Sequence, residues 1–143
     1  MPRTRVEGTR STMEAPSWRN RIVGHGEEPP EQLLANPRNW RIHPELQQKA
    51  LAGVLREVGW VEEVVVNKRT GFVVDGHLRV ALAIREGQPT IPVQYVDLSE
   101  EEEQLILATL DPISAMAVAD EAQLSQLLAE IQTEDEAIQE LLD

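Results

Sequence analysis

The pentapeptide Asp75-Gly76-His77-Leu78-Arg79 gathers several residue types that do chemistry at one point of the chain. It joins an expected strand at 72–74 to an expected helix, so the glycine lies where the backbone bends and a ligand can come close. The first turn of a helix exposes unpaired N–H groups and the positive end of a dipole. Arg79 in that turn would add a forked, charge-assisted contact. Gly76, His77, Leu78 and Arg79 are therefore candidate phosphate-binding residues; the alternative is a tight turn in which Asp75 caps the helix.

The same stretch contains a candidate acid–base pair. His77 can donate or accept a proton near neutral pH, and Asp75 could orient it or hold a metal ion. Asp75 and His77 are thus candidate catalytic residues of a Mg²⁺-dependent nuclease or nucleotide hydrolase, with Arg79 steadying phosphate charge. No metal site held by the protein alone is expected, because the chain has no cysteine and its three histidines lack the spacing of metal ligands. Whether the chain is an enzyme stays open.

A second group of hydrogen-bond donors lies in the loop Asn36-Pro37-Arg38-Asn39-Trp40-Arg41. Two arginines and two asparagines around a rigid proline can contact phosphate or the edge of a base. The alternative is a capping loop in which Trp40 packs on the core and both arginines are solvated. Five other arginines precede this loop and could touch a nucleic-acid backbone: Arg3, Arg5, Arg10, Arg19 and Arg21.

Hydrophobic periodicity predicts the elements that position these residues. Apolar side chains recur at helical spacing over 46–58, with His43 as the expected cap and Gly59 after the end. Strands at 64–66 and 72–74 are expected to pair through a turn at 68–71, a short helix to end at Gly87, and 93–96 to form a strand with a parallel or mixed partner. Ile22-Val23 is expected to form a short strand, and Gly24 and Gly26 are expected to break regular structure after it.

The rear of the chain is acidic and predicted to be helical. Residues 99–143 hold thirteen acids and no Lys or Arg, and the 143 residues together carry a net charge of −12. Ser99 and Glu102 form a capping box, Asp111-Pro112 is expected to interrupt that helix, and Asp120 and Thr133 are expected to cap two more. The sequence thus predicts an α/β (α+β) fold, a small mixed sheet with packed helices followed by an acidic helical segment.

Composition excludes several classes of protein. The aromatic share of 3% argues against a stacking platform for single-stranded nucleic acid, and the absence of cysteine excludes a disulfide framework or a thiolate nucleophile. No run of apolar residues is long enough to span a membrane, and no secretory signal is visible, so the cytoplasm is the expected compartment. We expect a disordered basic tail at 1–20, a folded domain at 21–112 and an acidic amphipathic helical extension at 113–143.

From about 22 to 111, the order of these elements resembles the ParB/sulfiredoxin superfamily, specifically its ParB-like N-terminal ("ParB-like nuclease") domain. The resemblance rests on Asn36-Pro37-Arg38, Gly59-Trp60, the box at 72–79 and Ile91-Pro92-Val93. The box is similar to the Gly-x-x-Arg signature that contacts phosphates in nucleotide-binding members. The resemblance therefore implies phosphate contacts for Gly76, His77 and Arg79, and adds Asn36 and Arg38 from the opening loop.

Two departures narrow what the resemblance implies. Sulfiredoxin has a reactive cysteine where this chain has His77, so that redox activity is excluded. Partition-type ParB proteins use a Glu-Asn-x-x-Arg motif for CTP and magnesium, and the corresponding stretch at 111–115 keeps only the acid, Asp111. Asp75 or Asp111 would thus be the residues that meet a nucleotide-bound Mg²⁺.

The stretches 39–44, 58–61 and 107–112 resemble ParB-like domains associated with phage and bacterial DNA-modification methyltransferases. The resemblance implies binding of CTP or ATP with Mg²⁺, or of DNA phosphate, in DNA modification, segregation or phage DNA processes. The partners implied are DNA, a nucleotide, and a DNA methyltransferase or other DNA-processing protein; no membrane is implied. A second copy of the chain is a further expected partner, because amphipathic helices outside a compact α/β core often dimerise. The compartment would be the cytoplasm of a bacterial or phage-infected cell. The alternatives are the hydrolytic enzyme above and a protein-interaction or dimerisation module without catalysis.

Overall fold

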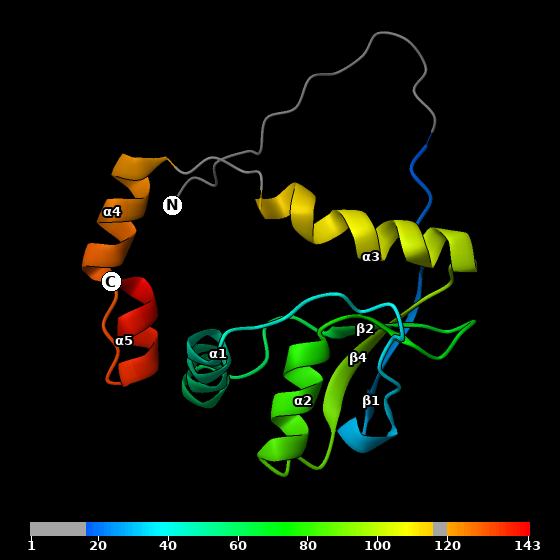
Figure 1. Ribbon diagram of the computed structural model, residues 1–143, viewed down its shortest axis with the longest axis horizontal. Helices are drawn as coiled ribbons and strands as arrows, with labels where there is room; N and C mark the ends of the chain where they lie inside the picture. Colours follow the sequence, from blue (N-terminus) through cyan, green and yellow to red (C-terminus); the bar gives the residue numbers. More distant parts are fainter. Residues whose placement is uncertain (1–16, 116–119) are drawn as a thin grey trace, which may run out of the picture.

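A four-stranded mixed sheet forms the framework of the computed structural model, which describes residues 17–115 and 120–143 (Figure 1). Its strands are β1 (Ile22–Glu28), β2 (Val64–Asn67), β3 (Val73–Asp75) and β4 (Ile91–Val96), in the order β1-β4-β2-β3. β4 runs antiparallel to β1 and parallel to β2, and β2 and β3 form the expected antiparallel hairpin. The predicted α+β fold with a small mixed sheet is confirmed.

The described residues also form five α-helices and one short 3-10 helix. They are η1 (Pro30–Gln32), α1 (Glu45–Glu57), α2 (His77–Arg85), α3 (Glu100–Ala115), α4 (Glu121–Glu130) and α5 (Glu136–Leu142). α2 packs on β2 and on η1, α1 packs against α2, and α5 packs on α1 (Figure 1). The rear of the described chain is helical, as the sequence predicts.

The core lies between α2 and the sheet and is built by alternating apolar residues. Val64 and Val66 of β2 and Ile91 and Val93 of β4 are buried, because alternate residues of a strand point to the same face. Val80 and Ala83 of α2, one turn apart, cover them. Burial of each valine contributes about 1.5–3 kcal/mol. This contact fixes where α2 begins relative to the end of β3.

The strand β1 is longer than the sequence predicts, because it continues through Gly24 and Gly26. The ring of Tyr95 on β4 lies over both glycines, and a Cβ atom at Gly26 would lie 3.4 Å from its Cε2 atom. The Tyr95 hydroxyl donates a hydrogen bond to the carboxylate of Glu28, which raises the pKa of Tyr95 to about 12. The two glycines therefore leave space for an aromatic ring on the neighbouring strand, and the expectation that they break the strand is wrong.

Two expected helix caps are also wrong. The first residue before α1 is Pro44, and the His43 side chain bonds Gln47 without capping the helix. Asp135, not Thr133, caps α5 by accepting a hydrogen bond from the Ile138 N–H. In both places the side chain suggested by spacing has another partner: the Thr133 hydroxyl donates to Glu57 of α1.

The acidic C-terminal segment begins with α3, whose first turn is bonded to the residue that precedes β1. Ser99 and Glu102 form the predicted capping box, with Ser99 Oγ accepting from the Glu102 N–H at 3.2 Å. Glu102 also receives the Arg21 guanidinium on both carboxylate oxygens, which holds the pKa of Glu102 well below its usual range. Arg21 is thus engaged in joining β1 to α3. The expected interruption at Pro112 is wrong, because the backbone of α3 continues to Ala115; a proline removes one helical hydrogen bond without forcing an end.

The predicted nucleic-acid contacts at Arg3, Arg5 and Arg10 lie outside the described residues, as does most of the expected tail at 1–20. Arg19 lies within them, 3.9 Å from Glu102. Among the described residues, no helix has the length and apolar character needed to cross a membrane.

Candidate functional site

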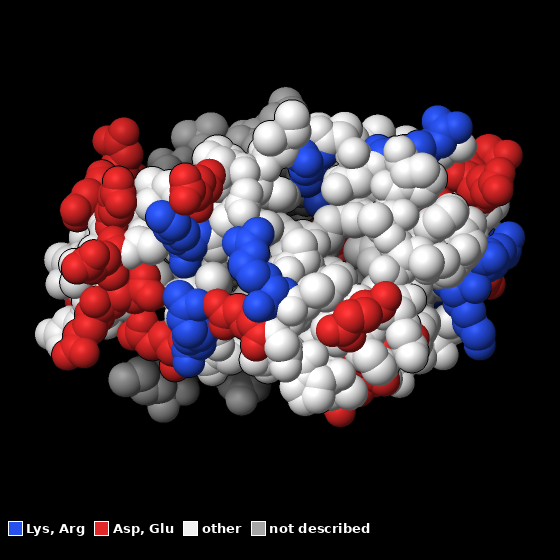
Figure 2. All heavy atoms as spheres, turned by 60° about the horizontal axis from the view of Figure 1, so that its bottom comes forward, with Lys and Arg blue, Asp and Glu red and all other residues white. Residues whose placement is uncertain are grey.

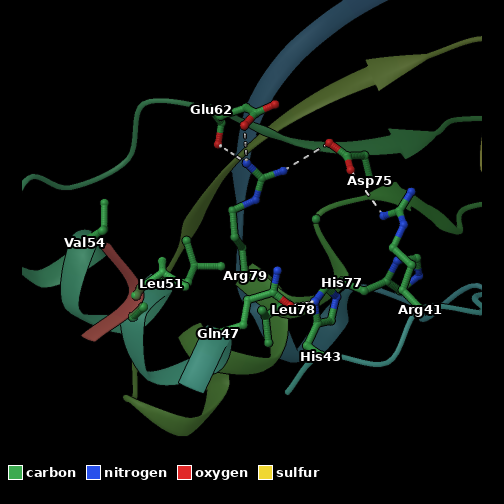
Figure 3. Close-up of a pocket in the computed structure, with 13 residues that line it drawn as sticks. Arg41, His43, Gln47, Leu51, Val54, Glu62, Asp75, His77, Leu78 and Arg79 are labelled. Atoms are coloured by element: carbon green, nitrogen blue, oxygen red, sulfur yellow. Dashed lines mark hydrogen bonds and ion pairs between the residues drawn. The ribbon is translucent and has the colours of Figure 1, made fainter. Parts of the chain in front are cut away.

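A cavity of about 470 Å³ opens beside the first turn of α2, where the sequence places its strongest candidate residues (Figure 3). α1 supplies its apolar wall, through Ala50, Leu51 and Val54, and Leu141 of α5 completes that wall. The rest of the lining comes from the loop before α1, the first turn of α1, the segment before β2 and the β3–α2 junction: Arg41, His43, Gln47, Glu62, Asp75, Gly76, His77, Leu78 and Arg79. The cavity therefore has an apolar side and a charged side.

Gly76 produces the turn from β3 into α2. Its φ of 101° lies in the left-handed region, and a Cβ atom there would lie 2.8 Å from Nη2 of Arg79 and 3.2 Å from Cγ2 of Val64. The helix begins at His77 with Gly76 as its cap, so the alternative in which Asp75 caps α2 is wrong. The N–H groups of His77, Leu78 and Arg79 have no partner within the helix, because they precede its first full turn. All three residues line the cavity.

The Arg79 guanidinium lies inside the cavity and is held by the protein's own acids. Nη2 is 3.2 Å from Oδ2 of Asp75, and Nη1 is 3.1 Å from the Glu62 carboxylate and donates to the Glu62 carbonyl at 3.3 Å. Only 11% of the Arg79 side chain is exposed, against 71% for Glu62. An incoming anion would have to replace these carboxylates, a competition that sequence analysis did not anticipate.

Arg41, one of the two arginines of the predicted donor loop, is a second guanidinium at the same carboxylate. Its Nη1 lies 3.5 Å from Oδ1 of Asp75, so each oxygen of that carboxylate faces a different arginine (Figure 3). The side chain is 14% exposed and also lies over the ring of Trp40, with 5.8 Å between Cζ and the ring centroid. Arg41 belongs to the predicted donor loop, but only the fold shows that it reaches the β3–α2 junction.

His77 links the same loop to α2. Its Nε2 accepts a hydrogen bond from the Asn36 N–H at 2.9 Å, so Nδ1 carries the hydrogen in the neutral ring. Nδ1 is buried and has no hydrogen-bond partner in the described structure. Burial, together with the positive charge of Arg41, lowers the pKa of His77. His77 is therefore neutral near pH 7, with its basic nitrogen engaged in a structural contact.

The structure brings Asp75, Gly76, His77, Leu78 and Arg79 together at one cavity, whereas the other two candidates lie beside it. Asn36 is buried and its Oδ1 accepts from the Arg38 N–H at 3.0 Å; the Arg38 side chain is exposed, and neither residue lines the cavity. The side chain of Asp111 lies outside the described part of the structure. Within the described ranges, no group of three or more His, Asp or Glu residues could hold a metal ion by itself.

The position of Trp40 differs from the predicted capping loop, in which this side chain would pack on the core. It is half exposed, and its indole N–H donates to the Leu107 carbonyl of α3 at 3.0 Å. Trp60, in contrast, packs against the main core, as its place after α1 predicts.

Comparison with solved structures shows which fold this is. The chain matches the C-terminally truncated chromosome-partitioning protein ParB from Caulobacter crescentus, solved in complex with CTP-γ-S, with a TM-score of 0.56 and 27% sequence identity. The chain has a ParB-like fold. A Pnob8-like ParB-N domain matches the ParB-like fold of this chain with a TM-score of 0.50 at 16% identity. No protein-family model and no curated protein matches the sequence.

The ParB-like region accounts for most of this chain but for less of its neighbours. The match covers 76% of this chain and 64% of the Caulobacter ParB chain, and 62% of this chain and 37% of the ParB-N domain. The resemblance read from the opening loop and the Gly-x-x-Arg box is thus confirmed at the level of fold.

Proposed function

We propose that this chain is a ParB-like module that binds a nucleotide, or a phosphate of DNA, at the first turn of α2. The observation that carries the proposal is the convergence of two guanidinium groups, from Arg41 and Arg79, and three free helical N–H groups on one cavity. The Caulobacter ParB neighbour was solved with a nucleotide analogue, which supports the same class of ligand here. The proposed setting is DNA modification, segregation or a phage DNA process.

The phosphate groups would take over the contacts that Asp75 and Glu62 now make. A phosphate presents three acceptor oxygens to forked guanidinium donors, whereas Asp75 offers each arginine a single oxygen, and charge-assisted bonds of this kind contribute about 1.5–3 kcal/mol each. The exchange is feasible because Glu62 is largely exposed and returns readily to water. Gly76, His77 and Leu78 would supply the backbone contacts.

The dimensions and charge of the site favour a nucleotide over duplex DNA. A cavity of about 470 Å³ is in the usual range for small-molecule sites, and its wall of Leu51, Val54 and Leu141 could cover a base or sugar. The thirteen acids at 99–143 repel a long polyanion. CTP and ATP are the proposed ligands. A nucleotide brings its own Mg²⁺, and the described residue that fits it is Asp75, whose carboxylate is released when phosphate takes both arginines.

Titration calorimetry with CTP and ATP, with and without Mg²⁺, tests the proposal. We expect binding by the natural chain and a loss of at least about tenfold in affinity for Arg79→Ala, since a buried charged contact is removed. Arg85→Ala, at the exposed end of the same helix, is the matched control and should bind normally. Circular dichroism shows whether each variant is folded. If Arg79→Ala does not fold, Arg79→Lys is titrated in its place, because it keeps the positive charge but lacks the forked donors. No heat of binding with either nucleotide would overturn the proposal.

Hydrolysis is the second candidate function, because Asp75 and His77 line the cavity that would hold the phosphates. We propose Asp75 as the residue that meets Mg²⁺ and His77 as the acid–base group, a role that requires Nε2 to release the Asn36 N–H. Release of phosphate from CTP or ATP, or nicking of plasmid DNA, should require Mg²⁺ and should disappear in Asp75→Asn. Equal background rates of phosphate release and of nicking for the natural chain and Asp75→Asn would exclude hydrolysis as a function. Association with a DNA methyltransferase remains a prediction from the resemblance, and dimerisation remains a prediction from the acidic amphipathic helices.

A further inference from the structure

The helix α4 presents an apolar stripe that the described structure leaves partly exposed. Leu124, Leu127, Leu128 and Ile131 follow one another at helical spacing, so they share one face. Leu124 is 43% exposed, Leu127 55% and Ile131 39%, and α4 contains no buried residue. A helix of ten residues is marginally stable in water unless its apolar face is packed. The stripe therefore has the properties of a contact surface.

A hollow between α4 and α5 extends this stripe. It has a volume of about 450 Å³ and is lined by Leu128 and Ile131 from the α4 side and by Leu142 from α5. α5 itself is anchored, because Ile138 is buried and Asp135 packs on Gly53 of α1. One wall of the groove is thus rigid, and a second apolar helix could lie in it.

Every charged side chain of the segment that forms this groove is a carboxylate. Residues 120–143 include eight carboxylates and no Lys or Arg: Asp120, Glu121, Glu130, Glu134, Asp135, Glu136, Glu140 and Asp143. Figure 2 shows acidic side chains gathered at the end of the molecule where Figure 1 places α4 and α5. A partner that buries the stripe must come close to this charge.

We propose that the α4–α5 groove docks a basic amphipathic helix of another protein. Leucine-type side chains at one-turn intervals would fill the stripe and the hollow, and Lys or Arg beside them would meet the carboxylates of this segment. A second copy of this chain is a poor occupant, because its α4 would bring the same carboxylates against these. DNA is a poor occupant for the same reason. The groove and the α2 cavity both border α5, but no residue lines both, so the inference does not rest on nucleotide binding.

The test measures binding of a labelled peptide of about 18 residues, made of Leu at helical spacing with Lys elsewhere, to the full chain by fluorescence anisotropy. A scrambled peptide of the same composition, without an apolar face, reports charge attraction alone. We expect the amphipathic peptide to bind at least about tenfold more tightly than the scrambled one. Equal affinities would overturn the proposal.

Protein variants locate the surface. Leu124→Ser combined with Leu127→Ser should reduce affinity for the amphipathic peptide by at least about tenfold, because exposed leucines are removed without touching the core. Gln126→Ser, in the same helix but outside the stripe, is the matched control and should bind as the natural chain does. Circular dichroism verifies that α4 persists. Unchanged binding by the double variant would overturn the proposal, as would light scattering that shows a dimer abolished by the same two changes.

Discussion

The backbone N–H of Asn36 donates a hydrogen bond to Nε2 of His77 over 2.9 Å, although the two residues are 41 positions apart. This contact joins the loop that carries Arg41 to the first residue of α2. Arg41 then reaches Asp75, and Asp75 reaches Arg79. Glu62, before β2, contacts Arg79 as well, so the charged side of the cavity is a chain of contacts among residues from three separate segments.

The Asn36–His77 contact makes stability depend on pH. Nε2 accepts only while the ring is neutral, and the pKa of His77 is lowered from 6.5 in the folded chain by burial and by Arg41. The unfolded chain then binds the proton more readily, so the contribution is complete above about pH 6.5 and is lost as pH falls through the lowered pKa. Urea unfolding at about pH 7.5, 6.5 and 5.5 should show a fall in the free energy of unfolding that is smaller in His77→Gln. Parallel curves for the two proteins would contradict this account.

Gly76→Ala should be more harmful than its backbone angle alone requires. A left-handed φ costs an alanine about 1 kcal/mol, and the new Cβ would also meet Arg79 Nη2 at 2.8 Å and Val64 Cγ2 at 3.2 Å. Gly59→Ala is the matched control, because Gly59 has nearly the same φ, 103°, and a Cβ there meets nothing within 4 Å. We expect denaturant unfolding to show the larger loss of stability at Gly76, and calorimetry to show weakened nucleotide binding only there. Equal losses of stability would mean that the crowding relaxes freely.

Arg41 and Arg38 should differ in their effect on nucleotide binding. Arg41 shares Asp75 with Arg79 inside the cavity, whereas Arg38 is exposed and lies beside it. Arg41→Ala should lower affinity for CTP or ATP by about tenfold or more, and Arg38→Ala by less than about twofold. The reverse order in a titration would show that the loop rearranges so that the motif residue Arg38, not Arg41, meets the phosphates.

Asn67→Ala should destabilise the whole domain. The fully buried Asn67 donates from Nδ2 to the Leu98 carbonyl and to Glu103, and its Oδ1 accepts from the Leu98 N–H, so one side chain joins β2 to the start of α3. Its loss leaves several buried polar groups unpaired, at about 1–3 kcal/mol for each. Thermal or urea unfolding should show a loss of at least about 2 kcal/mol. A stability within error of the natural chain would mean that water replaces the amide in a site that now excludes it.

Local pattern was sufficient for most of the secondary structure. The apolar repeat at 46–58, the turn at 68–71 and the capping box at Ser99 each depend on neighbours in the chain, and the structure has α1, the β2–β3 hairpin and the start of α3 there. Local pattern gave the wrong prediction where a residue distant in the sequence determines the structure. The ring of Tyr95 keeps Gly24 and Gly26 within a strand, and Glu57 takes the Thr133 hydroxyl that was expected to cap α5.

The candidate site divides in the same way. The position of Gly76, His77, Leu78 and Arg79 at a strand-to-helix junction follows from the sequence alone, because the junction is a local bend between two periodic segments. The rest of the cavity lining does not follow from the sequence alone: Glu62, Arg41 and the apolar wall of α1 and α5 come together only when the sheet forms and the helices pack. Chain neighbours determined which residues begin α2, and tertiary packing decided which charges face them.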